Sequence, residues 1–294
     1  MGSLLQYAFI QNALISGSLI AVVGALTGYF LLARGLTFAG HALPNVGFAG
    51  AAGAVLVGVK PVLGMFVFTI LAGLGIGAIG RNPRQRDTAI GVLMTFALGM
   101  GLLFLNLYSG YAQRVYSILF GTILGISRAD VLVTAGTTLL VALFVTFFYR
   151  PLLFSTFDPE VAEARGVPVG FIAYALLILA AVAVSISIQV MGAILVFTLI
   201  VGPAASAMRL TRRPALTILV AILLGIGYVW GGIVLAMITG DLPVSFFVSS
   251  IAFVVYVPVR VFSSSRQIDS TGREGDETGS ARGELPGPLA SEAR

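Results

Sequence analysis

A histidine and an asparagine with helical spacing are the residues of this chain best placed to do chemistry. His41 is the only histidine among 294 residues, and Asn45 follows it by four positions in an apolar stretch. On an α-helix this spacing puts the imidazole and the carboxamide on one face. Pro44 has no backbone N–H, so the carbonyl of Gly40 loses its helical partner. The carbonyl oxygen of Gly40, a ring nitrogen of His41 and the amide oxygen of Asn45 are therefore expected to lie close together as possible ligands.

The elements that position these residues are predicted to lie in a membrane. The chain is 58% hydrophobic and 10% charged, with a mean hydropathy of +1.02, whereas a soluble domain carries about 25% charged residues. No segment shows the short alternating pattern of an outer-membrane strand. We expect an all-α integral membrane protein in which an ionisable group such as His41 faces a cavity or a transport path.

Apolar runs of spanning length predict a polytopic bundle of about nine transmembrane helices, eight to nine allowing for the uncertain edges. The predicted spans are 10–32, 36–58, 61–79, 88–108, 129–149, 170–189, 190–209, 215–238 and 244–262. The apolar stretch 115–127 is too short to cross and predicts a re-entrant or interfacial helix.

The distribution of basic residues predicts the orientation of the bundle. Ten arginines fall on one side of the predicted spans: Arg34, Arg81, Arg84, Arg86, Arg150, Arg165, Arg209, Arg212, Arg213 and Arg260. The other side has three basic residues, Lys60, Arg114 and Arg128. The richer side is expected in the cytoplasm, which puts the N-terminus outside and the C-terminus inside a cytoplasmic membrane.

Composition divides the chain into two regions. Residues 1–262 form the predicted transmembrane domain, and residues 263–294, rich in Ser, Gly, Glu, Asp and Arg, form a predicted disordered cytoplasmic tail. No Lys or Arg precedes Arg34, so residues 1–33 lack the basic leader region of a signal peptide and the first span is expected to stay in the mature protein.

Several kinds of chemistry are excluded by the residues that are missing. A P-loop ends in Gly-Lys-Ser/Thr, but the only lysine, Lys60, stands between Val59 and Pro61, so any ATP must be hydrolysed by another subunit. The carboxylates before the tail fall at predicted span ends or in loops, which disfavours an intramembrane protease and weakens a proton-driven carrier. The sequence pI of about 9.8 does not indicate nucleic-acid binding, because the arginines flank apolar spans.

A short surface helix is predicted in the longest cytoplasmic loop between spans. Asp158 is expected to be its N-cap, Pro159 its first residue and Gly166 its end, while Glu160 favours the positive end of the helix dipole. The segment also contains Glu163 and Arg165. On this pattern alone it is either a capped linker or a helix lying across the cytoplasmic mouth.

With these residues in view, the chain resembles the membrane permeases of the ATP-binding-cassette zinc/manganese importer family. The resemblance covers about residues 10–260 and rests on the order of several blocks: Arg34-Gly35-Leu36-Thr37-Phe38-Ala39-Gly40-His41-Ala42-Leu43, Asp87-Thr88-Ala89-Ile90-Gly91-Val92, Leu119-Phe120-Gly121-Thr122-Ile123-Leu124, Phe157-Asp158-Pro159-Glu160, Ala164-Arg165-Gly166-Val167, Val190-Met191-Gly192-Ala193-Ile194-Leu195 and Gly202-Pro203-Ala204-Ala205.

The resemblance implies a homodimeric or pseudo-dimeric permease that imports Zn²⁺, Mn²⁺ or Fe²⁺. It also implies cytoplasmic P-loop ATPase subunits and an extracytoplasmic metal-binding protein as partners. This chain would bind no cofactor of its own, and the metal ion would be its cargo. The helix from Asp158 to Val167 would be the coupling helix that docks on the ATPase.

The second span departs from the family pattern Gly-Asp-Ala-Leu-Ser-His-Ala, whose Asp and His are thought to hold the metal. Aligned from Arg34 without a gap, the Asp position is His41, the Ser position is Pro44 and the His position is Asn45. A shifted alignment would match His41 to the family's His and leave Thr37 at the acidic position. Imidazole suits Zn, Fe or Ni and an amide oxygen is a weaker partner, so affinity is expected to be lower than for an Asp/His pair.

Other interpretations remain open at this point. His41 could instead be hydrogen-bonded between helices, and Asn45 could join helices. The chain could be a permease for a metal chelate of the siderophore or cobalamin type, an autonomous secondary metal carrier, or a membrane scaffold without transport.

Overall fold

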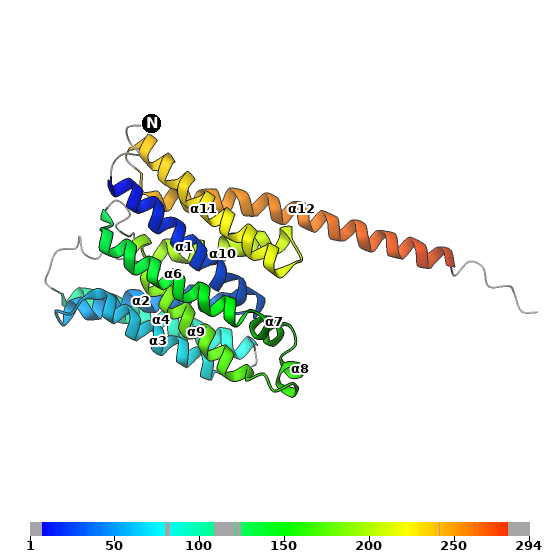
Figure 1. Cartoon of the computed structure of the whole chain (residues 1–294), viewed down its shortest axis with the longest axis horizontal. Coiled ribbons are helices and arrows are strands. Elements are labelled where there is room, and N and C mark those ends of the chain that lie inside the picture. Colours follow the sequence, from blue (N-terminus) through cyan, green and yellow to red (C-terminus); the bar gives the residue numbers. More distant parts are fainter. Residues whose placement is uncertain (1–7, 80–82, 109–120, 122–124, 241, 282–294) are drawn as a thin grey trace, which may run out of the picture.

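The protein is helical throughout the ranges that its structure, a computed structural model, describes: residues 8–79, 83–108, 121, 125–240 and 242–281 (Figure 1). The helices are α1 (Ala8–Ala33), α2 (Thr37–Leu56), α3 (Pro61–Ala78), α4 (Pro83–Leu107), α6 (Arg128–Phe147), α7 (Tyr149–Phe157), α8 (Pro159–Ala164), α9 (Val169–Met191), α10 (Ala193–Leu210), α11 (Pro214–Thr239) and α12 (Val244–Ala281). These ranges contain no strand, and the predicted all-α fold class is confirmed.

The long helices coincide with the predicted spans. Eight helices in the described ranges are long and apolar enough to cross a membrane: α1, α3, α4, α6, α9, α10, α11 and α12. Helix α2 occupies the remaining predicted span, 36–58, and has 20 residues. It is less apolar because it contains His41, Pro44 and Asn45. The polar residues singled out from the sequence thus lie in the one long helix that hydropathy does not mark as a span.

Two sequence predictions concern regions that the structure describes only in part. The segment 115–127 lies outside the described residues except for Gly121 and residues 125–127, so its re-entrant shape stays a prediction. Helix α12 runs to Ala281, and its apolar spanning portion is Val244–Phe262. The boundary after residue 262 and the disorder of the tail 263–294 also stay predictions.

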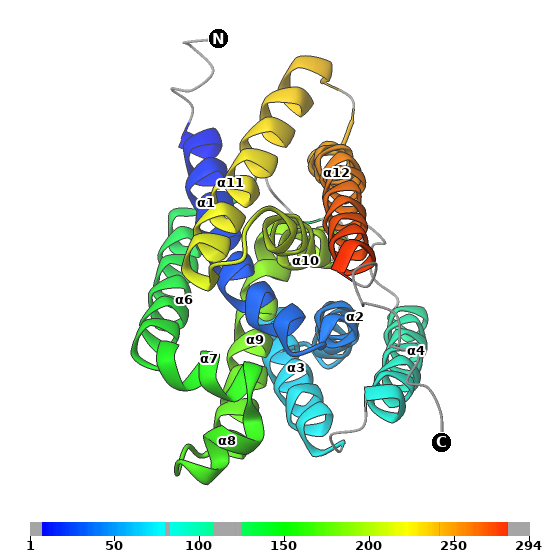
Figure 2. The same cartoon turned by 90° about the vertical axis from the view of Figure 1, so that its right-hand side faces the viewer.

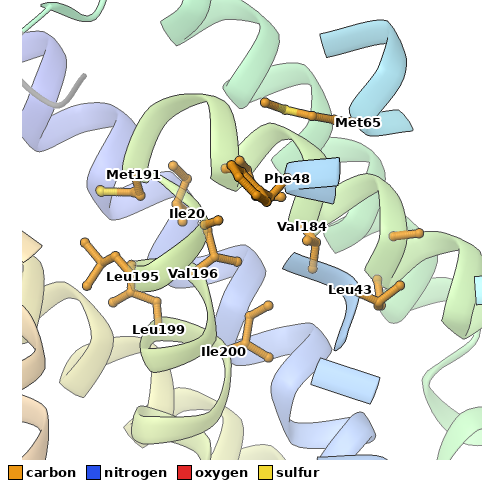
Figure 3. Packing of buried hydrophobic residues seen from close by; sticks show 14 of the residues in the cluster. Ile20, Leu43, Phe48, Met65, Val184, Met191, Leu195, Val196, Leu199 and Ile200 are labelled. Carbon is orange, nitrogen blue, oxygen red and sulfur yellow. The ribbon is translucent and has the colours of Figure 1, made fainter. Parts of the chain in front are cut away.

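The bundle places α2 in its interior. Helix α2 packs against α3 and α4, while α1 packs against α6, α10 and α11 (Figure 2). One continuous core joins these groups, and it includes Leu43 and Phe48 of α2, Val184 of α9 and Val196 of α10 (Figure 3). Because lipid does not drive apolar helices together, close packing and polar contacts must hold such a bundle.

Glycine permits the closest of these helix contacts. A Cβ atom built on Gly64 of α3 would clash with the carbonyl oxygen of Gly50 of α2, and a Cβ on Gly50 would clash with the carbonyl oxygen of Gly64. Only hydrogen fits in either place, so the backbones of α2 and α3 meet directly there. This contact fixes the position of the helix that carries His41.

Candidate functional site

His41 and Asn45 lie together on the accessible stripe of α2. Between residues 39 and 52 they are the only two residues that are not buried. The predicted common face is confirmed, since the helix continues through Pro44 without a break in its assignment. Two polar side chains are therefore accessible on a helix whose other residues in this stretch are packed against neighbours.

The imidazole of His41 packs against a phenyl ring of another helix. Its centroid is 4.6 Å from that of Phe197 on α10, and the two planes are inclined by 68°. Atom Nδ1 of His41 is buried and has no hydrogen-bond partner among the described residues. The alternative of a histidine hydrogen-bonded between helices through Nδ1 therefore finds no acceptor or donor here.

Asn45 is oriented by its own helix. Its Nδ2 donates a hydrogen bond to the backbone carbonyl of His41, at 2.7 Å. The amide oxygen, Oδ1, is not used in that bond and keeps both lone pairs. The amide nitrogen of Asn45 thus bonds the backbone, and the amide oxygen is left to accept from, or coordinate, another group.

This pair is a sparse donor set for a metal ion. The described residues contain no group of three or more His, Cys, Asp or Glu side chains that could hold a metal. Two carboxylates are used elsewhere: Asp130 caps α6 and accepts from Nε2 of Gln189 at 2.9 Å, and Asp158 caps α8. A metal-ligating histidine usually donates its second ring N–H to an acceptor, and Nδ1 of His41 lacks one. We therefore expect transient rather than tight binding.

The predicted surface helix is present as α8, Pro159–Ala164, at one end of the bundle (Figure 1). Asp158 is its N-cap and accepts from the backbone N–H of Val161 at 3.1 Å, and Pro159 is the first helical residue. Gly166, at φ +79°, ends the turn that follows. The local structure predicted for Asp158, Pro159 and Gly166 is confirmed.

Helix α8 exposes nearly all of its surface. Ala162 is the one fully buried residue and anchors the helix, whereas Glu160, Glu163 and Arg165 are exposed. The guanidinium carbon of Arg165 lies 5.7 Å from the ring centroid of Phe154 on α7. Helix α8 is thus a short capped helix whose exposed surface could contact another protein.

Sequence reasoning did not identify three residues around these sites. Phe197 carries no signal beyond hydrophobicity. The sequence predicts an orienting role for Arg34 and Arg86, and it places Arg34 at the start of the first family block, but it predicts no contacts for either. In the structure Arg34 donates to Ser155 and Thr156 on α7, and Arg86 donates to the carbonyl oxygen of Gly35. For both arginines, the available signal is a charged residue near the end of an apolar span.

Two of the sequence blocks that are distant along the chain meet in space. Gly121, at φ +77°, packs so closely on the α9–α10 junction that a Cβ there would clash with the backbone carbonyl of Met191. Gly192, at φ +81°, separates α9 from α10. The turn that begins α10, the helix of Phe197, is therefore held by backbone contact with Gly121.

Comparisons with known proteins agree with this architecture. The model of the ABC 3 transport family matches residues 6–263. The manganese transport system membrane protein MntC of Halalkalibacterium halodurans is 34% identical over 236 residues, covering 80% of this chain and 81% of that protein. The manganese import system permease protein ScaB of Streptococcus gordonii is 32% identical over 223 residues, covering 76% and 80%.

The fold is also found among solved structures. A chain of PsaBC from Streptococcus pneumoniae, in complex with a Fab, aligns with a TM-score of 0.78 and 26% sequence identity, covering 88% of this chain and 93% of that chain. The resemblance to the zinc/manganese permeases seen in the sequence blocks is confirmed by these matches. By its sequence and its fold, the chain belongs to the ABC 3 transport family.

Proposed function

We propose that this chain is the transmembrane permease subunit of an ATP-binding-cassette importer for a divalent transition metal ion, namely zinc, manganese or iron. The similarity to MntC and ScaB, whose names state manganese transport and import, supports this cargo class. The absence of a Gly-Lys-Ser/Thr sequence supports ATP hydrolysis on a separate partner subunit.

The observation that carries the proposal is the accessible stripe of α2. Its two polar residues, His41 and Asn45, are the only unburied positions between residues 39 and 52. A polar face on a deeply packed helix of a membrane bundle is costly unless it serves a path. In this proposal the ion passes along that face and contacts the His41 imidazole and Asn45 Oδ1.

The donor set bears on which ion passes most readily. Manganese favours carboxylate, carbonyl and water oxygens, whereas imidazole suits zinc and iron. With a neutral imidazole and an amide in place of the family's Asp and His, the site carries no formal negative charge. We infer that the ion binds more weakly here than in relatives that have the acidic residue. The loss of affinity should be smaller for zinc or iron than for manganese.

ATP hydrolysis on the partner would be coupled to the permease through α8. The exposed outer face of α8, with Glu160, Glu163 and Arg165, is the proposed docking surface for the cytoplasmic ATPase. The N-cap at Asp158 stabilises the first turn of this helix. Phe157, 66% exposed just before the cap, offers an apolar anchor of the kind that protein interfaces favour. Movement of α8 would be coupled to alternating access in the bundle.

The remaining parts of the assembly follow from the family and the charge distribution. We propose a cytoplasmic-membrane protein with its N-terminus outside and its C-terminus in the cytoplasm, working as a homodimer. An extracytoplasmic metal-binding protein would deliver the ion. Two copies of the His41/Asn45 pair would then serve one transport path.

Metal accumulation in cells tests the proposal. Cells that lack their own importer and carry this chain with its partner ATPase and binding protein should accumulate zinc, manganese or iron. His41→Ala should reduce uptake to near background at unchanged protein level. His41→Gln, which keeps a hydrogen-bonding side chain but no imidazole, should also fail. Uptake equal to the native protein in both variants would remove His41 from the mechanism.

A further inference from the structure

A second polar feature lies at the end of the bundle that carries α7 and α8 (Figure 2). A cavity of about 420 Å³ opens there between the ends of α1 and α3, the start of α4, helix α7 and the start of α9. Its lining residues with polar side chains are Arg34, Arg86, Ser155, Thr156 and Tyr174. This cavity is separate from the stripe formed by His41 and Asn45.

Arg34 lines the cavity, and its hydrogen-bond partners among the described residues are neutral groups. Its Nε donates to Thr156 Oγ1 at 3.0 Å and its Nη2 donates to Ser155 Oγ at 2.7 Å. Burial lowers the pKa of Arg34 to about 10, so the guanidinium stays protonated at neutral pH. A guanidinium has five N–H donors, so three remain for another acceptor.

Arg86 of α4 also lines this cavity. Its Nη2 donates to the carbonyl oxygen of Gly35 at 2.9 Å, in the turn that directly follows Arg34. Its Nε is buried and has no hydrogen-bond partner among the described residues. Within the described part of the chain, neither guanidinium forms an ion pair with a carboxylate.

Two partly buried cations that line one cavity, with no carboxylate among the lining residues, are energetically unfavourable. Like charges repel, and removing each charge from water carries its own cost. A bound anion relieves both effects. Planar guanidinium groups bind phosphate with paired hydrogen bonds that are shorter and stronger than those between neutral groups.

Most of the remaining cavity wall is apolar. Leu36, Ile76, Ile79, Val169 and Leu177 line it, and they belong to segments at the ends of membrane-spanning helices. A ligand that suits this lining has a phosphate next to hydrocarbon. The phospholipid at a membrane surface has this combination, and anionic lipids attract basic groups at the cytoplasmic leaflet.

We propose that this cavity is a binding site for a phosphate group held by Arg34 and Arg86, and that the phosphate belongs to an anionic phospholipid. The ligand would join the α1–α2 turn at Gly35 to Ser155 and Thr156 of α7, the helix directly before α8. Lipid occupancy would therefore stiffen the base of α8. The proposal uses the proposed orientation only in choosing the lipid source, and it does not depend on metal transport.

The test compares lipids added to the purified full-length chain in uncharged detergent. Dioleoyl phosphatidylglycerol should raise the melting temperature more than dioleoyl phosphatidylcholine does, and native mass spectrometry should find it retained preferentially. Arg86→Gln should weaken retention of phosphatidylglycerol by about tenfold, as expected for the loss of charge-assisted bonds. The control is Arg212→Gln, at an exposed arginine between α10 and α11, which should keep the native preference.

Two further measurements decide whether the phosphate comes from a lipid, and whether loss of binding reflects misfolding of the variant. Inorganic phosphate at millimolar concentration should not reproduce the stabilisation. Stabilisation of the native protein by inorganic phosphate alone, lost in Arg86→Gln, would overturn the lipid source. Arg86→Lys keeps the charge without the planar fork and should retain part of the preference. Equal retention of both lipids by the native protein, or full preference in Arg86→Gln and Arg86→Lys, would overturn the site.

Discussion

The side chain of Asn45 donates through Nδ2 to the backbone carbonyl of His41, with 2.7 Å between the nitrogen and the oxygen. The bond closes within one turn of α2 and sets which end of the carboxamide faces outward. It couples the two polar residues of the α2 stripe, because the acceptor belongs to the residue whose imidazole is the other candidate ligand. Changes at Asn45 should therefore alter ion binding more than folding.

Asn45→Asp should raise the affinity for the transported ion. A carboxylate attracts a divalent cation electrostatically and supplies the oxygen ligand that manganese favours. The half-saturating manganese concentration for uptake should fall by about tenfold, or about 1.4 kcal/mol of binding free energy. The lost intrahelical bond should lower the free energy of unfolding by about 1 kcal/mol. Asn45→Leu, the control of similar size, should reduce uptake; equal half-saturation in all three proteins would contradict a role for this position.

Gly64→Ala should destabilise the bundle through its contact with Gly50. The new Cβ would clash with the carbonyl oxygen of Gly50, so α2 and α3 must separate, at a cost of about 1–3 kcal/mol or more. The melting temperature of the purified protein should fall. Gly75→Ala, on the same helix with nothing within 4 Å of its Cβ, should be neutral or stabilising by up to about 1 kcal/mol. Equal melting temperatures for the two variants would refute the close α2–α3 contact.

Asp158→Ala should weaken the association with the partner ATPase. Loss of the N-cap bond to Val161 destabilises the start of α8 by about 1 kcal/mol. A helix with a partly unfolded first turn presents a less ordered docking surface. Less ATPase should co-purify with the tagged permease, and metal-dependent ATP hydrolysis should fall. Asp158→Asn keeps a capping oxygen and should behave as the native protein does. If Asp158→Ala recovers as much ATPase as Asp158→Asn, the capped helix is not required for docking.

Removal of metal should leave the stability of the permease unchanged. The ion is cargo in the proposed function, and His41 and Asn45 are too few donors for a structural site, which normally supplies many kcal/mol of folding free energy. Incubation with EDTA should not shift the melting temperature, whereas it should abolish uptake. A clear drop in melting temperature on chelation would indicate a resident metal, in conflict with the cargo assignment.

Much of the helical layout could be read from the sequence because its causes are local. Runs of apolar residues must be about 17 to 25 residues long to cross a bilayer as helices, and the predicted span 36–58 matches α2, Thr37–Leu56. Helix α8 was predicted from Asp158, Pro159 and Gly166 because capping depends on residues three or four positions apart. The same helical period placed His41 and Asn45 on one face before any neighbour was known.

The neighbours themselves were decided only by the tertiary structure. Nothing in the sequence pairs His41 with Phe197, Arg34 with Ser155 and Thr156, or Gly50 with Gly64. In a membrane the apolar surfaces of all helices are nearly equivalent, since lipid is as apolar as the side chains, and helices choose partners through small residues and a few hydrogen bonds. The sequence by itself therefore determined which apolar segments form the long helices and how α8 is capped, while three-dimensional packing decided which polar groups meet and which remain free to bind a ligand.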